Sequence, residues 1–164
     1  MTNDITTTGP DLTVLKSYLE GRNEIIAAYL FGSHARGEAD VRSDVDIALL
    51  LRPGLPDVHH LKLRLDTEIC NVLNSDDVDV LFLNRAPLPM QAEVIRTGRL
   101  IVSNDDEAQV EFEVRTTNAW WDFQPLLAEF DRIYFESLKR GFTDEQRRIY
   151  QATLELLARA NPPA

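Results

Sequence analysis

The sequence lacks paired cysteines, long apolar runs and an excess of basic residues. Its only cysteine, Cys70, excludes internal disulfides and thiolate metal clusters. The longest apolar runs, residues 25–31 and 47–51, are far shorter than the roughly 20 residues that span a bilayer, so no membrane helix is expected. The first ten residues contain no lysine, no arginine and no apolar core, which argues against a secretory signal and favours a cytoplasmic protein.

The charge balance is acidic. Lysine and arginine total 17 and aspartate and glutamate total 27, which gives a net charge of −10 and a pI near 4.7. Because phosphate contacts need clustered basic side chains, we expect no direct nucleic-acid binding. A length of 164 residues with 44% hydrophobic content is enough for one domain with a sizeable core and an appendage.

Apolar periodicity predicts an α+β fold. Leucines at helical spacing predict a helix over 12–19, ended by Gly21, and a further helix is expected over 58–74. Pro87 and Pro89 are expected to precede a short helix that runs to Thr97. Four apolar or alternating runs predict strands, at residues 24–31, 44–51, 77–83 and 99–103. We therefore expect a frayed N-terminus over 1–10, an α+β core over 11–103 and a helical extension over 104–164, whose many aromatic residues favour binding to a partner.

Within the extension, three residues indicate where helices begin and end. Pro125 is expected to start a new helix rather than to kink a long one. Gly141 is expected to end that helix, and Thr143 with Gln146 has the form of a capping box that opens a final helix to about Ala160.

The segment from Leu30 to Leu51 contains the residues that indicate chemistry. A buried strand ends in Gly32 and Ser33, where a glycine permits close backbone approach and helix-start N–H groups attract phosphate. Asp44 and Asp46 open the next strand on the same side. Unpaired carboxylates are costly in an apolar strand, so this pair needs a cation, for which Mg²⁺ is well suited.

A third carboxylate and a nearby arginine extend this pattern. Asp79 lies between two valines of a later strand and could reach the same site if the strands are neighbours. Three carboxylates can hold two metal ions that stabilise the attacking and leaving oxygens of phosphoryl or nucleotidyl transfer. Arg36 is close enough in sequence to help neutralise a triphosphate. His34 is expected in solvent.

The run GSHARGEADVRSDVDI, with Asp79 in a later strand, resembles the minimal nucleotidyltransferase branch of the polymerase-beta-like superfamily. The resemblance covers about residues 24–102 and implies a small core of mixed sheet flanked by helices. It further implies ATP as substrate, two Mg²⁺ ions, and catalysis and metal binding by three carboxylates: Asp44, Asp46 and Asp79. Nucleotide binding is implied for four residues: Gly32, Ser33, Arg36 and Ser43. Asp77, on the same strand face as Asp79, is the rival for the third carboxylate.

The extension resembles a second, narrower group. Residues 112–141 are similar to the tail of antitoxins in HEPN/MNT toxin–antitoxin pairs. That resemblance implies a protein adenylyltransferase that silences a cognate HEPN ribonuclease toxin by transferring AMP to a tyrosine, in a hetero-oligomer. An acidic chain would suit a basic ribonuclease partner.

Two alternatives remain open from the sequence. The chain could neutralise its partner by binding alone, or it could transfer a nucleotide to the hydroxyl of a small molecule such as an aminoglycoside. Because a simple binding protein has no physical need for the carboxylate cluster, the sequence favours an enzyme. The core also leaves no obvious domain for recognising a small substrate.

Overall fold

The structure is a computed structural model that describes residues 11–40, 42–141 and 148. It has a four-stranded mixed sheet in the order β3-β2-β1-β4. The strands are β1 (Ile25–Phe31), β2 (Val45–Leu51), β3 (Val78–Phe82) and β4 (Arg99–Ser103). β1 pairs antiparallel with both β2 and β4, and β2 pairs parallel with β3. The α+β fold and all four strands confirm the sequence-based expectation, with bounds that differ by one residue at most.

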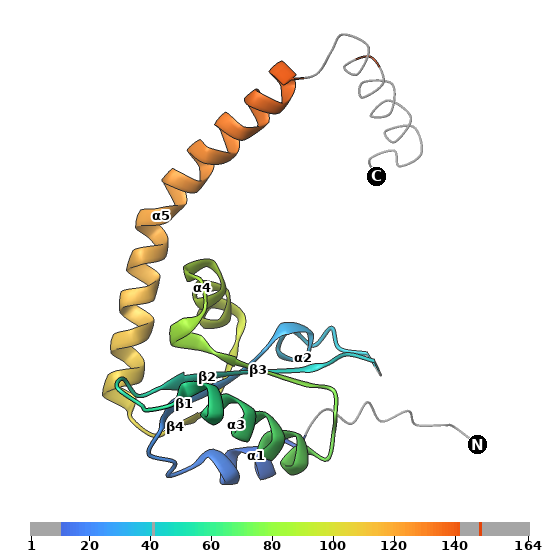
Figure 1. Ribbon diagram of the computed structural model, residues 1–164, viewed down its shortest axis with the longest axis vertical. Coiled ribbons are helices and arrows are strands. Elements are labelled where there is room, and N and C mark those ends of the chain that lie inside the picture. Colours follow the sequence, from blue (N-terminus) through green and yellow to red (C-terminus); the bar gives the residue numbers. More distant parts are fainter. Residues whose placement is uncertain (1–10, 41, 142–147, 149–164) are drawn as a thin grey trace, which may run out of the picture. The chain divides into compact units, whose positions relative to one another are not determined.

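Helices cover both faces of this sheet (Figure 1). α1 (Leu12–Leu19) and α3 (Val58–Leu73) pack on one face, and α4 (Leu88–Thr97) packs on the other. A short 3-10 helix, η1 (Leu83–Arg85), follows β3. β1 and β2 are buried on both faces, which explains why their sequences are nearly continuous apolar runs.

Alternation along β2 gives each face its own core. Ile47 and Leu49 lie in the core beneath α1 and α3, whereas Ala48 and Leu50 lie in the core that includes Val94 of α4. This division follows from the strict alternation of side chains along a strand. The side chain of Asp46 therefore belongs to the face that α4 covers.

The sequence-based prediction of a new helix at Pro125 is wrong. α5 is one helix, Asp106–Gly141, with Pro125 inside it. Proline lacks the N–H that would bond to the carbonyl of Trp121, a loss that usually breaks a buried helix. Here Pro125 is exposed, so water can hydrate that carbonyl and the helix continues. Gly141 is the last described residue of α5, so the helix end predicted there stays a prediction, and the helix predicted from Thr143 to Ala160 lies outside the described residues.

The chain divides into two compact units, Met1–Trp120 and Trp121–Ala164. The first unit includes the start of α5, where Phe112 joins the core on the α4 face. The boundary predicted at Ser103 thus falls inside a unit that extends further along α5, and the assignment of 104–164 as a partner-binding element stays a prediction. Within the described ranges, no helix is long and apolar enough to cross a membrane.

Candidate nucleotidyltransferase site

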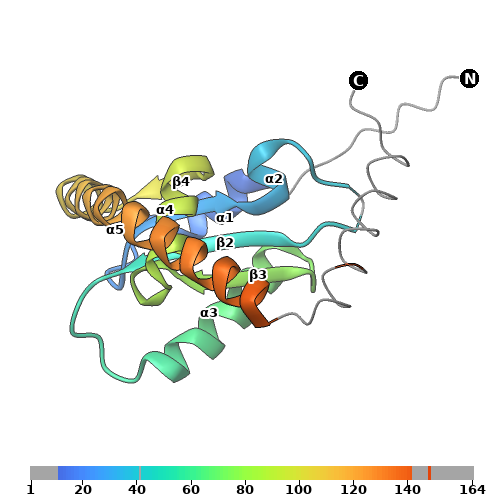
Figure 2. The same ribbon diagram turned by 90° about the horizontal axis from the view of Figure 1, so that it is seen from above.

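The candidate site lies where β1 ends and β2 begins. β1 runs directly into the short helix α2 (Gly32–Arg36), which ends at Gly37 in the left-handed conformation. Figure 2 shows α2 at this end of the sheet. The strand register places Phe31 opposite Asp46, so the Gly32–Ser33 turn lies beside the first residues of β2.

Gly32 is required here for two reasons. Its φ is +65°, a conformation that side-chain-bearing residues rarely adopt. A Cβ at this position would lie 2.0 Å from Oδ2 of Asp46 and 2.9 Å from its Cγ. The absence of a side chain therefore leaves room for the Asp46 carboxylate against the turn.

Asp46 and Asp79 are direct partners in the parallel pairing of β2 and β3. Partners on adjacent strands project from the same face, so the two carboxylates are neighbours. Asp44 lies two residues before Asp46, just ahead of β2. The structure thus pairs two of the carboxylates that the sequence singles out, Asp46 and Asp79, and places Asp44 just before them in the chain.

Electrostatics show that these carboxylates interact. Burial raises the pKa of Asp46 above its ordinary value, and the charges of Asp79 and Asp44 raise it further, in that order. His34 and Arg36 act in the opposite direction on the same carboxyl. Three like charges with incomplete compensation form a site that a cation would stabilise.

These residues fit a magnesium site completed by substrate. Among the described residues, no three His, Cys, Asp or Glu side chains form a group that could hold a metal by themselves. Mg²⁺ commonly takes one or two carboxylates and fills its remaining positions with water and substrate phosphates. Asp44 and Asp46, with Asp79 beside them, provide that kind of open carboxylate set.

Asp77, the rival of Asp79, has a different position. It precedes β3, and its backbone carbonyl accepts a hydrogen bond of 2.9 Å from the N–H of Val45. That bond holds the start of β2 against the start of β3. The direct pairing with Asp46 belongs to Asp79, which favours Asp79 as the third carboxylate.

Ser43 and Arg36 make local contacts in the structure. The Ser43 hydroxyl donates to Oδ1 of Asp40 at 3.2 Å and accepts from the Asp40 N–H at 2.9 Å, which closes the turn before Asp44. Nε of Arg36 donates to Glu38 at 2.7 Å, and Arg36 is exposed. Their roles in nucleotide binding stay predictions, as do those of Gly32 and Ser33.

His34 has a contact that sequence reasoning missed. Instead of lying free in solvent, it is half-buried, and its Nε2 lies 3.2 Å from the carbonyl oxygen of Ser43. Because a carbonyl only accepts, Nε2 carries the hydrogen in this bond. The contact ties α2 to the residue before Asp44, and no local sequence signal could have indicated it.

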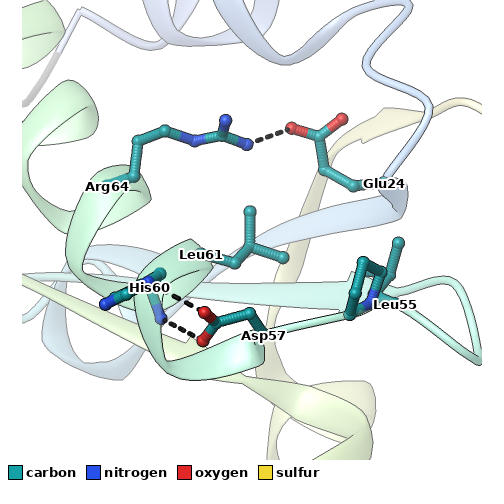
Figure 3. A pocket seen from close by; sticks show the side chains of 7 residues that line it. Glu24, Leu55, Asp57, His60, Leu61 and Arg64 are labelled. Carbon is teal, nitrogen blue, oxygen red and sulfur yellow. Dashed lines mark hydrogen bonds and ion pairs between the residues drawn. The ribbon is translucent and has the colours of Figure 1, made fainter.

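A separate cavity lies at the other end of β2. It has a volume of about 370 Å³ and is lined by residues before β1 and from the loop and helix that follow β2 (Figure 3). Its charged groups are paired with each other: Arg64 with Glu24 at 3.3 Å, and His60 with Asp57 at 2.8 Å. None of the three site carboxylates lines this cavity, so we assign it no part in the candidate site.

Together, a strand, a glycine turn and carboxylates on two adjacent strands define a nucleotidyltransferase-type centre. The model of the family "Polymerase beta, Nucleotidyltransferase" matches residues 14–107, more than half of the chain. The chain therefore belongs to the polymerase beta nucleotidyltransferase family, which confirms the family resemblance of the sequence and the enzyme class it implies.

Known proteins give a narrower likeness. The chain is 32% identical over 107 residues to the protein adenylyltransferase MntA of Shewanella oneidensis, covering 64% of this chain and 70% of that protein. It is similar to a crystal structure of a toxin–antitoxin with AMP-PNP, at 25% identity and a TM-score of 0.56, over 77% of this chain and 94% of that one.

A further solved structure shares the fold. It contains the tri-AMPylated HEPN toxin of Shewanella oneidensis in complex with its MNT antitoxin. The identity is 24% and the TM-score 0.52, over 77% of this chain and 92% of that chain.

Proposed function

We propose that this chain is an antitoxin that transfers AMP from ATP to a tyrosine hydroxyl of a cognate HEPN ribonuclease toxin. The observation that carries the proposal is the pairing of Asp46 with Asp79 beside a glycine turn that leaves room for the carboxylate. The likeness to a protein adenylyltransferase and to a toxin–antitoxin complex with an ATP analogue supports the choice of ATP and of a protein acceptor. We expect the reaction to take place in the cytoplasm.

In this proposal the acceptor hydroxyl oxygen attacks the α-phosphorus of ATP. A new oxygen–phosphorus bond forms, the bond to the β-phosphate oxygen breaks, and pyrophosphate leaves with the electron pair. Gly32 and Ser33 bind the phosphates through backbone N–H groups and the hydroxyl, as helix starts do. Arg36, released from Glu38, would neutralise part of the triphosphate charge.

Asp79 accepts the proton of the attacking hydroxyl. It is exposed on β3, which is an edge strand of the sheet, so the side chain of another protein can reach it. Two Mg²⁺ ions bound by Asp44, Asp46 and Asp79 would supply the positive charge that stabilises the attacking and leaving oxygens.

The test is the intact mass of the partner after incubation with this protein, ATP and Mg²⁺. The partners tested are the purified products of the reading frames adjacent to the one that encodes this chain. We expect mass gains of one or more AMP units with the wild type and none with the Asp44→Asn, Asp46→Asn double variant. Asp76→Asn, which removes an exposed carboxylate just outside β3, serves as the matched control and should retain transfer.

Two results would contradict parts of this proposal. A stable complex without any mass gain would leave neutralisation by binding alone as the function. Loss of transfer in Asp77→Asn with transfer retained in Asp79→Asn would reverse the assignment of the third carboxylate.

A further inference from the structure

The second unit carries an exposed apolar stripe on α5. Its residues, Leu126, Phe130 and Ile133, follow the spacing i, i+4, i+7 and therefore share one helix face. Their exposed fractions are 49%, 60% and 51%. Large apolar side chains at this spacing are the usual anchors of a helix that binds in a groove of another protein. We define these three residues as the 126–133 stripe.

Acidic residues lie along one edge of this stripe: Asp122, Glu129 and Glu136 follow one another at intervals of seven residues and therefore share one side of the helix. Residues 121–136 contain four acidic side chains and one basic side chain, Arg132, so their net charge is 1 − 4 = −3. Arg132 is engaged by two of these acids, with Nη2 2.6 Å from Glu129 and Nη1 3.0 Å from Glu136. Hydrogen bonding to Arg132 lowers the pKa of Glu129, which keeps that carboxylate ionised. The rim of the 126–133 stripe along this edge is therefore negative at neutral pH.

The negative rim distinguishes between two possible binding partners of the stripe, a second copy of this chain and a different protein with a basic surface. Two copies of this chain that met through the stripe would bring two acidic rims together, and juxtaposed like charges oppose association. A partner with an apolar groove bordered by lysine and arginine would instead find complementary charge. Such a basic surface is what a ribonuclease needs to bind RNA.

We propose that the 126–133 stripe is the docking surface for the acceptor protein, which covers it with an apolar groove rimmed by basic residues. This inference rests on the proposed function and adds a second contact, separate from the catalytic centre. The stripe raises the local concentration of the acceptor, while the carboxylates carry out the transfer. Changes in the stripe should therefore act on KM for the acceptor and leave kcat in place.

The test compares Leu126→Glu and Phe130→Glu with Leu63→Glu. Leu63 lies on α3 in the first unit and is 66% exposed, so the control introduces the same charge at a similarly exposed position. Affinity for the purified protein encoded beside this chain is measured by calorimetry, and transfer by initial rates. We expect each stripe variant to lose at least tenfold in affinity and to raise KM with kcat unchanged, whereas Leu63→Glu should match the wild type.

Two further measurements make the outcome decisive. Phe130→Ala removes the ring but keeps a strong helix former, so it separates lost docking from lost helix, and it should also weaken binding. Higher salt should weaken wild-type binding, since complementary charges are screened.

Unchanged affinity in Leu126→Glu, Phe130→Glu and Phe130→Ala would overturn the proposal even if AMP transfer proceeds. A wild-type homodimer that these variants convert to monomer would overturn it as well. The binding experiment needs no catalysis, so a failure of the transfer reaction alone would leave this test intact.

Discussion

Residue 32 and Asp46 depend on each other sterically. The Asp46 carboxylate occupies the place where a side chain at position 32 would begin, and the left-handed turn at residue 32 itself favours glycine. The same residue therefore sets both the path of the chain and the position of a carboxylate.

Gly32→Ala should abolish transfer, with a loss of at least about 100-fold, because the new methyl group must displace Asp46. Gly54→Ala is the matched control, since its φ is +77° and no atom lies within 4 Å of an added Cβ. Both variants should lose roughly 1 kcal/mol of stability from backbone strain. Thermal melts and AMP-transfer rates check this, and equal activity losses in the two variants would contradict the steric account.

The charge cluster predicts a pH dependence of stability. Because the folded-state pKa of Asp46 is raised, the folded protein binds more protons than the unfolded chain, so this group costs stability as pH rises through that pKa. Asp46→Asn should therefore raise Tm relative to the wild type at pH 7, and the difference should vanish towards about pH 3, below the ordinary aspartate pKa, where the carboxyl is protonated in both states.

Melting curves from pH 3 to pH 8 measure this effect, with Asp76→Asn as the control. Mg²⁺ at pH 7 should raise Tm of the wild type more than that of Asp46→Asn, since the ion relieves the repulsion only where the carboxylate is present. A lower Tm for Asp46→Asn at every pH would mean that Asp46 stabilises the fold.

At this scale the sequence was informative about residue types and poor about contacts. Gly32, followed by Asp44 and Asp46 at the spacing of one strand face, indicated the site, because few structural roles require a glycine turn and two carboxylates together. The hydrogen bond of His34 to the Ser43 carbonyl depends on how the intervening loop returns to α2, which local patterns do not encode.

At the scale of elements, strands were predicted better than the long helix. β1 and β2 are short apolar runs bounded by turn residues, so their ends are visible in the sequence. In α5, Pro125 suggested a helix boundary. The free-energy cost of a proline inside a helix depends on whether the carbonyl that loses its hydrogen bond can reach water, and the sequence does not reveal that exposure. Asp46 and Asp79 are partners because β2 and β3 pair in parallel in one particular register. The sequence is compatible with that register but does not determine it.

Pro125→Ala should strengthen the middle of α5. Alanine restores an N–H that can bond to the carbonyl of Trp121 and has the highest helix propensity, so the local gain should reach about 3 kcal/mol at most. Amide exchange over residues 122–129 should slow by about tenfold or more.

Pro89→Ala is the control for that experiment. Pro89 lies in the first turn of α4, where N–H groups have no partner within the helix, so its replacement should change exchange little. Equal slowing around both positions, or none at Pro125, would show that the proline does not limit α5.

On the scale of the whole molecule, the two units should differ in stability. The first contains the buried residues of both cores, whereas no described residue from 121 to 136 is fully buried. Segments with few buried contacts open at lower free energy than the global unfolding reaction.

Hydrogen exchange followed by mass spectrometry at increasing denaturant tests this difference. We expect amides of residues 121–136 to exchange at least about 100-fold faster than those of β1 and β2 in native buffer. Addition of the acceptor protein should slow exchange in 121–136 if the 126–133 stripe is covered. Equal exchange rates in both units, with a single unfolding transition as denaturant increases, would contradict the predicted difference in stability between the two units.

The parallel pairing of β2 and β3 also sets an order of events during folding. Asp46 and Asp79 are separated by 79 − 46 = 33 residues, and α3 must cross the sheet before β3 can join β2. Non-local strand pairing comes at the cost of loop closure and is slow compared with local turns. A chain emerging from the ribosome therefore holds its glycine turn and first two carboxylates before the third has been synthesised, and the carboxylate set is complete only when the edge strand β3 has docked.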